Sequence, residues 1–303
     1  MGYTAYEKSS ERMFIMEEEI VIIQNGELTA AIALSGSQLR SLKDKNGKEY
    51  IWRADPAVWP KSAPIMFPIC GGLKNDAYVY GGKTYTLPKH GFSTDCVYTV
   101  EEKTEDAVTL RITDSEKTRE MYPFGFVFRT RFALVGGTLV ISYSATNTGS
   151  ETLYYADGAH EGYACPEGIE AYDVVFEKEE TLLRTVLDGN LLEPTELPVE
   201  TDGKVLHMKY SHMNNDCLNF NAINSRSVKL INRQSGKGVQ VDFADFRHFV
   251  LWTKQNAPYL CVEPWNGRPD MIDADGILEH KPSMFALAAG ETLTHTHSVT
   301  PIL

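Results

Sequence analysis

Three short segments of this chain carry side chains that could move protons. They are residues 89–92 (Lys-His-Gly-Phe), 158–163 (Gly-Ala-His-Glu-Gly-Tyr) and 261–265 (Cys-Val-Glu-Pro-Trp). The side chains of interest are His90, His160 and Glu263. A reaction that places a proton on one oxygen while removing a proton from another needs a general acid and a general base with pKa values tuned toward neutrality. Two imidazoles and a carboxylate therefore predict acid–base catalysis.

The local sequence around each of these residues permits a structural interpretation as well. His90 stands where a strand should end and the chain should turn, a position typical of functional loops and also of histidines that merely bond the backbone. His160 lies between small residues, which leaves room beside its ring, but it could also pack among aromatic side chains. Glu263 ends the apolar run 259–262, which indicates a buried strand, and a carboxylate there is costly unless it is paired or functional.

Trp265 lies two residues after Glu263. A pyranose presents apolar C–H faces that suit an aromatic ring, so Trp265 could form a platform for a sugar. A tryptophan that only fills the core is an equal alternative.

Signals for a metal or a cofactor are weak. His295 and His297 lie on one face of a terminal strand and could chelate zinc, but the spacing shows no third ligand. Residues 270–276 resemble part of a calcium loop without its terminal glutamate, and we expect a solvated acidic turn. No phosphate-binding glycine motif precedes a helix. We therefore expect no metal and no cofactor.

Composition narrows the class of protein. The chain has 303 residues, 43% of them hydrophobic, and a formal net charge of −12, which opposes binding to nucleic acid or to an anionic membrane. Five cysteines without a Cys-x-x-Cys pair read as reduced thiols, and residues 1–20 lack the pattern of a secretory signal. We expect a cytoplasmic protein with one domain over residues 1–303, as a monomer or a homodimer.

Alternating apolar residues and turn signals recur along the chain. Asn-Gly at 25–26, Gly-Gly at 81–82 and 136–137, and the turn 234–237 each separate two strand-like runs. Residues 292–299 alternate again, whereas helical periodicity is weak and limited to single turns such as 55–59. These patterns predict an all-β protein, a large antiparallel β-sandwich of two curved sheets with few short helices.

The three segments, in this order and on a β-rich chain of this length, resemble the aldose 1-epimerase (galactose mutarotase) family, especially its LacX-like branch. Residues 67–75 resemble the Phe-Pro and Gly-Arg-Leu-Lys segment of the family, and residues 216–220 resemble its Asp-containing segment. The most specific stretches are 251–254 and 263–267. The resemblance covers nearly the whole chain.

This resemblance implies a supersandwich fold with a sugar site in an open cleft and no cofactor. It implies that Glu263 is the general base for the anomeric hydroxyl and that His160 is the general acid for the ring oxygen. His90 would hydrogen-bond the sugar near the reacting centre, and Asp216 would hold a remote hydroxyl. The implied activity is interconversion of the α and β anomers of a free aldose such as galactose or glucose.

The chain also departs from the family pattern. Gly72 stands where the family usually has arginine, and residues 93–95 (Ser-Thr-Asp) stand where another arginine is frequent. Lys74 or Arg268 could replace a lost contact. These departures motivate two alternatives, a non-catalytic sugar-binding or sensory protein and an enzyme for hexose 6-phosphates. The second is disfavoured, because phosphate recognition favours an arginine cluster.

Overall fold

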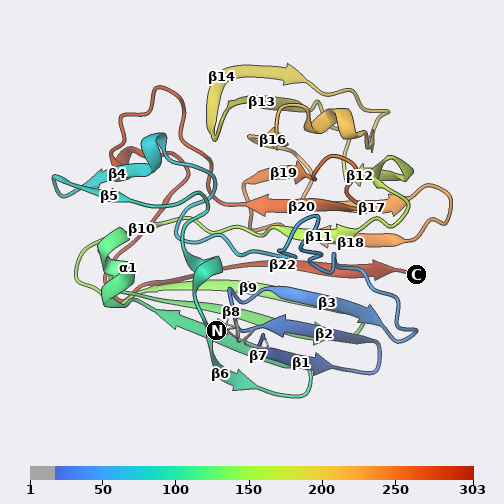
Figure 1. Cartoon of the computed structure of the whole chain (residues 1–303), viewed down its shortest axis with the longest axis horizontal. Helices are drawn as coiled ribbons and strands as arrows, with labels where there is room; N and C mark the ends of the chain where they lie inside the picture. The colour runs from blue at the N-terminus through green and yellow to red at the C-terminus, as the bar shows by residue number, and fades with distance from the viewer. Residues whose placement is uncertain (1–17) are drawn as a thin grey trace, which may run out of the picture.

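A computed structural model describes residues 18–303, and two large antiparallel sheets dominate it (Figure 1). The nine-stranded sheet has the order β15 (Val205–His207), β12 (Tyr172–Phe176), β17 (Ser227–Asn232), β18 (Gly238–Asp242), β22 (Thr292–Ile302), β9 (Thr138–Asn147), β8 (Phe126–Val135), β7 (Ala107–Thr113) and β6 (Thr99–Lys103). The six-stranded sheet has the order β11 (Glu161–Ala164), β20 (Tyr259–Trp265), β19 (His248–Trp252), β16 (Leu218–Phe220), β13 (Leu183–Asp188) and β14 (Leu191–Pro198).

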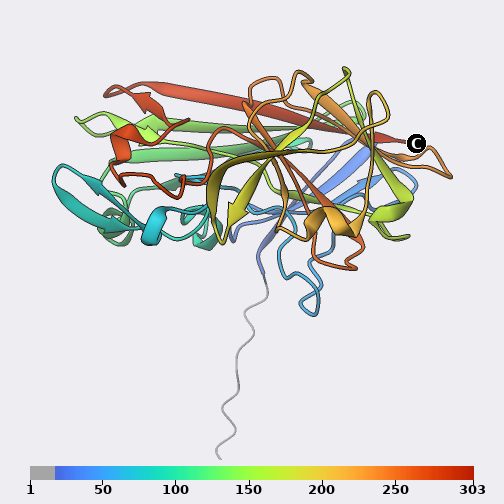
Figure 2. The same ribbon diagram turned by 90° about the horizontal axis from the view of Figure 1, so that it is seen from above.

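Smaller elements complete the fold. They are the sheet of β1 (Ile20–Gln24), β2 (Leu28–Ala33) and β3 (Leu39–Asp44), the hairpin of β4 (Ala77–Tyr80) and β5 (Lys83–Thr86), and the pair β10 (Leu153–Tyr155) with β21 (Phe285–Leu287). In Figure 2 the long strand β22 runs along one side of the molecule, and the β4–β5 hairpin lies at the end opposite the C-terminus. The predicted all-β sandwich is confirmed.

The predicted hairpins are confirmed by their strand pairing, although at 25–26 neither residue has the expected positive φ, and Oδ1 of Asn25 instead accepts from the amides of Glu27 and Leu28 at 2.9 and 2.8 Å. The pairs β1–β2, β4–β5, β8–β9 and β17–β18 are antiparallel and flank the four predicted turns. At 81–82 and at Gly136 the backbone has positive φ, which glycine adopts without steric cost. Turn chemistry thus sets the register of these strands locally.

Short helices punctuate the strands. Residues 55–59 form a single turn, in which the amides of Val58 and Trp59 donate to the carbonyl of Asp55 at 3.0 and 2.8 Å. Helix α1 (Glu116–Met121) was not predicted, since six residues are too few for a periodic signal, although Ser115 and Thr118 form a capping box at its start. The remaining helical segments are 3₁₀ turns: η1 (Lys74–Asp76), η2 (Ser93–Asp95), η3 (Ile169–Ala171), η4 (Tyr210–Met213) and η5 (Leu278–His280).

The two large sheets meet through their buried faces. Phe249 of β19 packs against Phe176 of β12, with ring centroids 6.0 Å apart. On β8 the alternate residues Phe126, Phe128, Phe132 and Leu134 are buried, and so is Thr130. The Thr130 hydroxyl shares a hydrogen bond of 2.6 Å with Ser37, which explains how a polar side chain fits this face.

The described residues test the predictions about cellular location only in part. Across residues 18–303, the helices are all too short or too polar to cross a bilayer. The prediction that residues 1–20 hold no secretory signal rests mostly on residues 1–17, which lie outside the described residues. All five cysteines lie within the described residues and are free thiols.

Candidate active site

The register of the sheet places His160 directly across from Glu263. One residue pair on each side of this position defines the register: Gly158 pairs with Trp265, and Glu161 pairs with Val262. Side chains opposite each other on antiparallel strands share one face and are close enough to interact. Accordingly, Nε2 of His160 lies 3.3 Å from Oε2 of Glu263. Residues 103 positions apart in the sequence thus form one contact pair.

The same row continues across the sheet. Glu263 on β20 pairs with Val250 on β19, and Val250 pairs with Asn219 on β16. The side chains of this row form the floor of a cavity of about 280 Å³. The residues lining the cavity are Trp59, Lys61, Pro64, Ile65, Met66, Gly71, Lys89, His90, Thr94, His160, Leu187, Asn190, Asp216, Cys217, Asn219, Val250, Trp252, Glu263, Trp265 and Pro269. Predicted catalytic residues from all three segments therefore meet in one place.

His90 is held by a double contact with Gly71. The His90 amide donates to the Gly71 carbonyl at 2.9 Å, and Nδ1 of His90 accepts from the Gly71 amide at 3.1 Å. Because Nδ1 is an acceptor, the ring proton of neutral His90 is on Nε2. The predicted sharp turn is confirmed, since His90 has φ +70° and Gly91 has φ +74°. His90 thus offers an N–H donor to the cavity.

Aromatic rings surround the pair of His160 and Glu263. The rings of Trp59 and Trp252 lie 5.4 and 5.6 Å from the His160 ring. Trp265 lies 5.4 Å from His90 and donates its Nε1–H to Oε2 of Glu263 at 3.1 Å. Trp265 is only 4% exposed yet lines the cavity, so it is both a packed residue and part of the wall.

Burial dominates the electrostatics of the site. Burial raises the pKa of Glu263 well above its ordinary range, and the hydrogen bond from Trp265 opposes this effect. Burial lowers the pKa of His160 to about 3. Burial also holds the pKa of His90 well below its usual value, and the neighbouring His160 ring adds to this effect. Each shift favours the neutral form of its group, so burial opposes an ion pair between His160 and Glu263.

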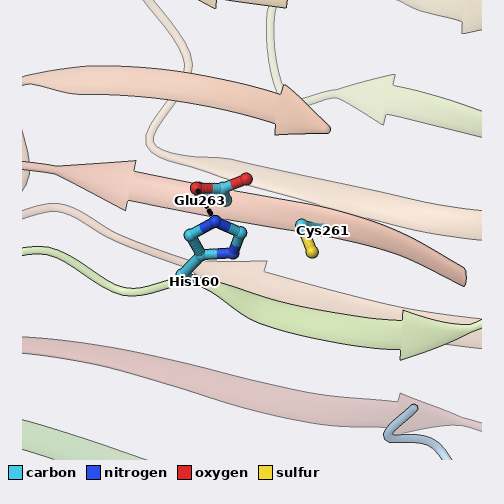
Figure 3. A group of neighbouring side chains, drawn as sticks. All are labelled: His160, Cys261 and Glu263. Carbon is cyan, nitrogen blue, oxygen red and sulfur yellow. Dashed lines mark ion pairs between the residues drawn. The ribbon is translucent and has the colours of Figure 1, made fainter. Parts of the chain in front are cut away.

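His160, Cys261 and Glu263 also form a group with metal-ligand atoms (Figure 3). Their candidate ligand atoms lie within 4.8 Å of one another, with Cys261 two residues before Glu263 on β20. Burial raises the pKa of the Cys261 thiol well above its ordinary value. Nε2 of His160 and Oε2 of Glu263 already contact each other at 3.3 Å, so these two side chains fit an acid–base pair.

The other suspected metal ligands have different partners. Nδ1 of His295 lies 2.8 Å from a carboxylate oxygen of Asp157, and Nε2 of His297 lies 3.2 Å from one of Glu161. These two contacts join β22 to the chain on either side of His160.

The acidic segment 270–276 is only partly the solvated turn that we expected. Asp275 is exposed and bonds His280, but Asp270 is 4% exposed and pairs with Lys281 at 2.5 Å. The prediction was wrong for Asp270 because its partner lies eleven residues further along the chain.

The predicted sugar contacts divide into two groups. Asp216 and Trp265 line the cavity, and Asp216 lies 3.7 Å from Nζ of Lys89. Lys74 and Arg268 are not among the lining residues. Nζ of Lys74 donates to the Ala274 carbonyl at 3.1 Å. Arg268 donates to the hydroxyl of Thr185 at 3.0 Å, and Thr185 pairs across the strands with Asn219. Arg268 therefore lies at the far end of the row that begins at His160.

At Gly72, where the chain departs from the family pattern, a neighbouring residue occupies the space beside the backbone. A Cβ atom on Gly72 would lie 2.9 Å from Cβ of Asn190 and 3.0 Å from its carbonyl oxygen. Asn190, in the turn between β13 and β14, thus fills the space where a longer side chain would begin. Sequence reasoning missed Asn190, Asn219, Lys61 and Trp59 as lining residues. Asn219 lies in the segment 216–220 that resembles the Asp-containing segment of the family, but we expected a sugar contact only from Asp216, and no motif marks the other three.

Comparison with known proteins agrees with the fold. A family model described as aldose 1-epimerase matches residues 19–300. The protein LacX (chromosomal) of Lactococcus lactis subsp. lactis is 34% identical over 292 residues, which cover 92% of this chain and 98% of LacX. A galactose mutarotase related enzyme from Lactobacillus acidophilus superposes with a TM-score of 0.89 at 31% identity, covering 94% of this chain and 98% of that one. A galactose mutarotase-like protein from Lactobacillus casei gives 0.88 at 25% identity, covering 94% and 100%.

Proposed function

Because this chain belongs to the aldose 1-epimerase family, we propose that it is a mutarotase that interconverts the α and β anomers of a free aldose such as galactose or glucose. The observation that carries this proposal is the 3.3 Å contact between His160 and Glu263 at the floor of a cavity that His90 also lines. An acid and a base on one face of a sheet can serve two oxygens of the same sugar.

The two oxygens of Glu263 have different roles in this mechanism. Oε2 accepts from Trp265 and faces His160, whereas Oε1 has no hydrogen-bond partner within residues 18–303. Oε1 is therefore the atom that takes the proton of the anomeric hydroxyl. His160 gives a proton to the ring oxygen, the bond between C1 and the ring oxygen breaks, and its electron pair stays on that oxygen. Rotation about C1–C2 and reversal of both proton transfers close the other anomer.

The reaction starts from ionised Glu263 and protonated His160, while burial favours the neutral form of each. The two states contain the same protons and differ by the transfer of one proton across 3.3 Å. Sugar hydroxyls supply hydrogen bonds to charged groups that burial has stripped of water, so bound sugar favours the ionised state. His90, as an N–H donor, stabilises charge that develops on oxygen.

Polarimetry tests this proposal. Freshly dissolved α-D-glucose and α-D-galactose are followed in dilute buffer with and without the protein. The mutarotase proposal predicts faster relaxation of optical rotation with at least one sugar. Binding of a sugar, seen by calorimetry, without faster relaxation would favour the non-catalytic alternative.

An enzyme for sugars with an anionic group is a second candidate, and one observation favours it. Lys61 and Lys89 both line the cavity, although Asp216 lies near Lys89 and no arginine is among the lining residues. Glucose 6-phosphate is the test substrate. Faster anomer exchange with this sugar than with glucose, lost in Lys61→Gln, would favour the second candidate.

Location and assembly stay predictions. Five free cysteines fit a reducing compartment, so the cytoplasm remains our expectation. A monomer or a homodimer, with a sugar as the only small-molecule partner, is expected.

A further inference from the structure

Asn219 is a buried side chain that the proposed mechanism does not use. It is 1% exposed, yet it lines the cavity. Its Oδ1 has no hydrogen-bond partner among residues 18–303. Buried polar atoms are nearly always hydrogen-bonded, and leaving one unpaired is destabilising. An unpaired amide that faces a cavity is therefore a position where a ligand hydroxyl would restore the missing bond.

A nearby asparagine shows what a structural amide looks like in this fold. Oδ1 of Asn215 accepts from the Leu187 amide at 3.1 Å, and its Nδ2 donates to the Leu187 carbonyl at 3.3 Å. Asn215 thus fixes a loop with both ends of its amide. Asn219 has no such backbone contact to its Oδ1.

The register fixes where Asn219 stands relative to the reacting groups. Asn219 pairs with Val250, and Val250 pairs with Glu263, so two strand spacings separate Asn219 from Glu263. Neighbouring strands lie about 4.8 Å apart, which gives roughly 10 Å between the two positions. The side chain between them, Val250, is short and apolar and lines the cavity.

A pyranose matches this spacing. Ordinary bond lengths put the oxygens on C1 and C4 about 5–6 Å apart. A hydrogen bond of about 2.8 Å at each end extends this to roughly 11 Å. With its C1 hydroxyl at Glu263, the ring lies over Val250 with an apolar C–H face down. The hydroxyl that reaches Asn219 is then the one on C4, across the ring from the anomeric carbon.

We infer that Asn219 is a specificity-determining residue that hydrogen-bonds the C4 hydroxyl of the aldose, an inference that rests on the proposed mutarotase function. Glucose and galactose differ in configuration at C4. Asp216, the remote contact implied by the family resemblance, has a 41% exposed side chain near Lys89, whereas Asn219 is almost fully desolvated. A mismatch at a desolvated amide costs more than one at a solvated carboxylate. Asn219 therefore sets the preference between sugars that differ at C4.

The test compares Asn219→Leu with wild-type protein on glucose, galactose and 4-deoxyglucose, a sugar that lacks the C4 hydroxyl. Leucine has the same branched shape and number of side-chain heavy atoms as asparagine, although its methyl groups are larger, and it has no hydrogen-bonding group. We expect kcat/KM of the preferred hexose to fall about 10- to 100-fold, as for the loss of a buried hydrogen bond, while the rate with 4-deoxyglucose stays within about twofold. Asn219→Asp, which keeps the acceptor, should restore most of the activity on the parent sugar.

Two results would overturn the inference. One is an equal loss with the parent and the 4-deoxy sugar, which would make Asn219 a structural residue. The other is no loss with any sugar. If Asn219→Leu does not fold, judged by thermal unfolding, Asn219→Ser takes its place with the same expected pattern.

A separate measurement distinguishes a failure of the mutarotase proposal from a failure of the Asn219 inference. If wild-type protein accelerates no anomer exchange, binding of glucose, galactose and 4-deoxyglucose is measured by the fluorescence of the tryptophans that line the cavity. Wild-type protein should then bind 4-deoxyglucose more weakly than the preferred hexose, and Asn219→Leu should bind the two sugars equally. This pattern would support the contact with Asn219 in a protein that binds the sugar but does not catalyse anomer exchange. No difference, or no binding at all, would contradict it.

Discussion

Trp265 donates its indole N–H to the same carboxylate oxygen of Glu263 that faces His160, at 3.1 Å. Two side chains thus hold Oε2, and Oε1 has no hydrogen-bond partner among residues 18–303. The contact between Trp265 and Glu263 follows from their i, i+2 spacing on β20, which puts both side chains on one face of the sheet. One strand therefore supplies both the proposed base and the group that orients it.

Trp265→Phe should change the pH dependence of the reaction. The hydrogen bond from Trp265 lowers the pKa of Glu263 against the effect of burial. Its removal raises this pKa further, so the acid limb of the rate profile moves to higher pH and kcat/KM near neutrality falls about 10-fold. The measurement is kcat/KM from pH 5 to pH 8. An unshifted acid limb would remove Trp265 from the control of Glu263.

His160→Asn should make the fold less sensitive to acid. The pKa of His160 is about 3 in the folded protein and about 6.5 in the unfolded chain, so between these values the unfolded state binds a proton that the folded state does not. This contribution to stability is complete above about pH 6.5 and is lost as the pH falls toward 3. Between pH 7 and pH 5 it amounts to about 2 kcal/mol.

The raised pKa of Glu263 acts in the opposite sense, since its contribution is present at low pH and is lost as the pH rises. Because Glu263 contacts His160 at 3.3 Å, its pKa changes when His160 is replaced, so the comparison is made in a Glu263→Gln background, in which this carboxyl is absent. Urea unfolding at pH 7 and pH 5 should show a smaller acid-induced loss of unfolding free energy in Glu263→Gln/His160→Asn than in Glu263→Gln. Equal losses would contradict a neutral, buried His160.

Gly91→Ala should destabilise the protein by more than about 3 kcal/mol or prevent folding. Gly91 has φ +74°, and a Cβ atom there would lie 2.2 Å from the Phe67 carbonyl oxygen. Gly82 is the matched control, since it has φ +75° and open space around its Cβ position. Gly82→Ala should cost only about 1 kcal/mol, from backbone strain alone. Unfolding free energies of the two variants that agree within error would refute the close packing beside His90.

Local signals in the sequence predict most of the strands but not their order. Asn-Gly and Gly-Gly turns fix hairpins between neighbouring strands, and the apolar run before Glu263 indicates a buried strand. The six-stranded sheet, however, joins β11 to β20 and β16 to β19, and neither pair is consecutive in the chain. Such contacts depend on tertiary packing, which no local pattern encodes.

Some residues of the candidate site could likewise be predicted from local sequence, and others could not. His90, His160 and Glu263 lie in segments whose residue types suggest chemistry, and the fold brings them to one cavity. Asn219 and Trp59 join them only because strand order and a loop place them there. Lys74 and Arg268 were predicted to contact the sugar because they lie near site segments in the sequence. Their side chains bond other groups and do not line the cavity.

The central claim is that Glu263 acts as the base in anomer exchange, and polarimetry on Glu263→Gln tests it most directly. The amide keeps the shape of the side chain but cannot take the proton, so the rate on the preferred aldose should fall at least about 100-fold. Glu102→Gln, which changes an exposed carboxylate on β6, is the control and should match wild type. Calorimetry should show that Glu263→Gln still binds the sugar. A Glu263→Gln protein that relaxes optical rotation as fast as wild type would contradict the claim.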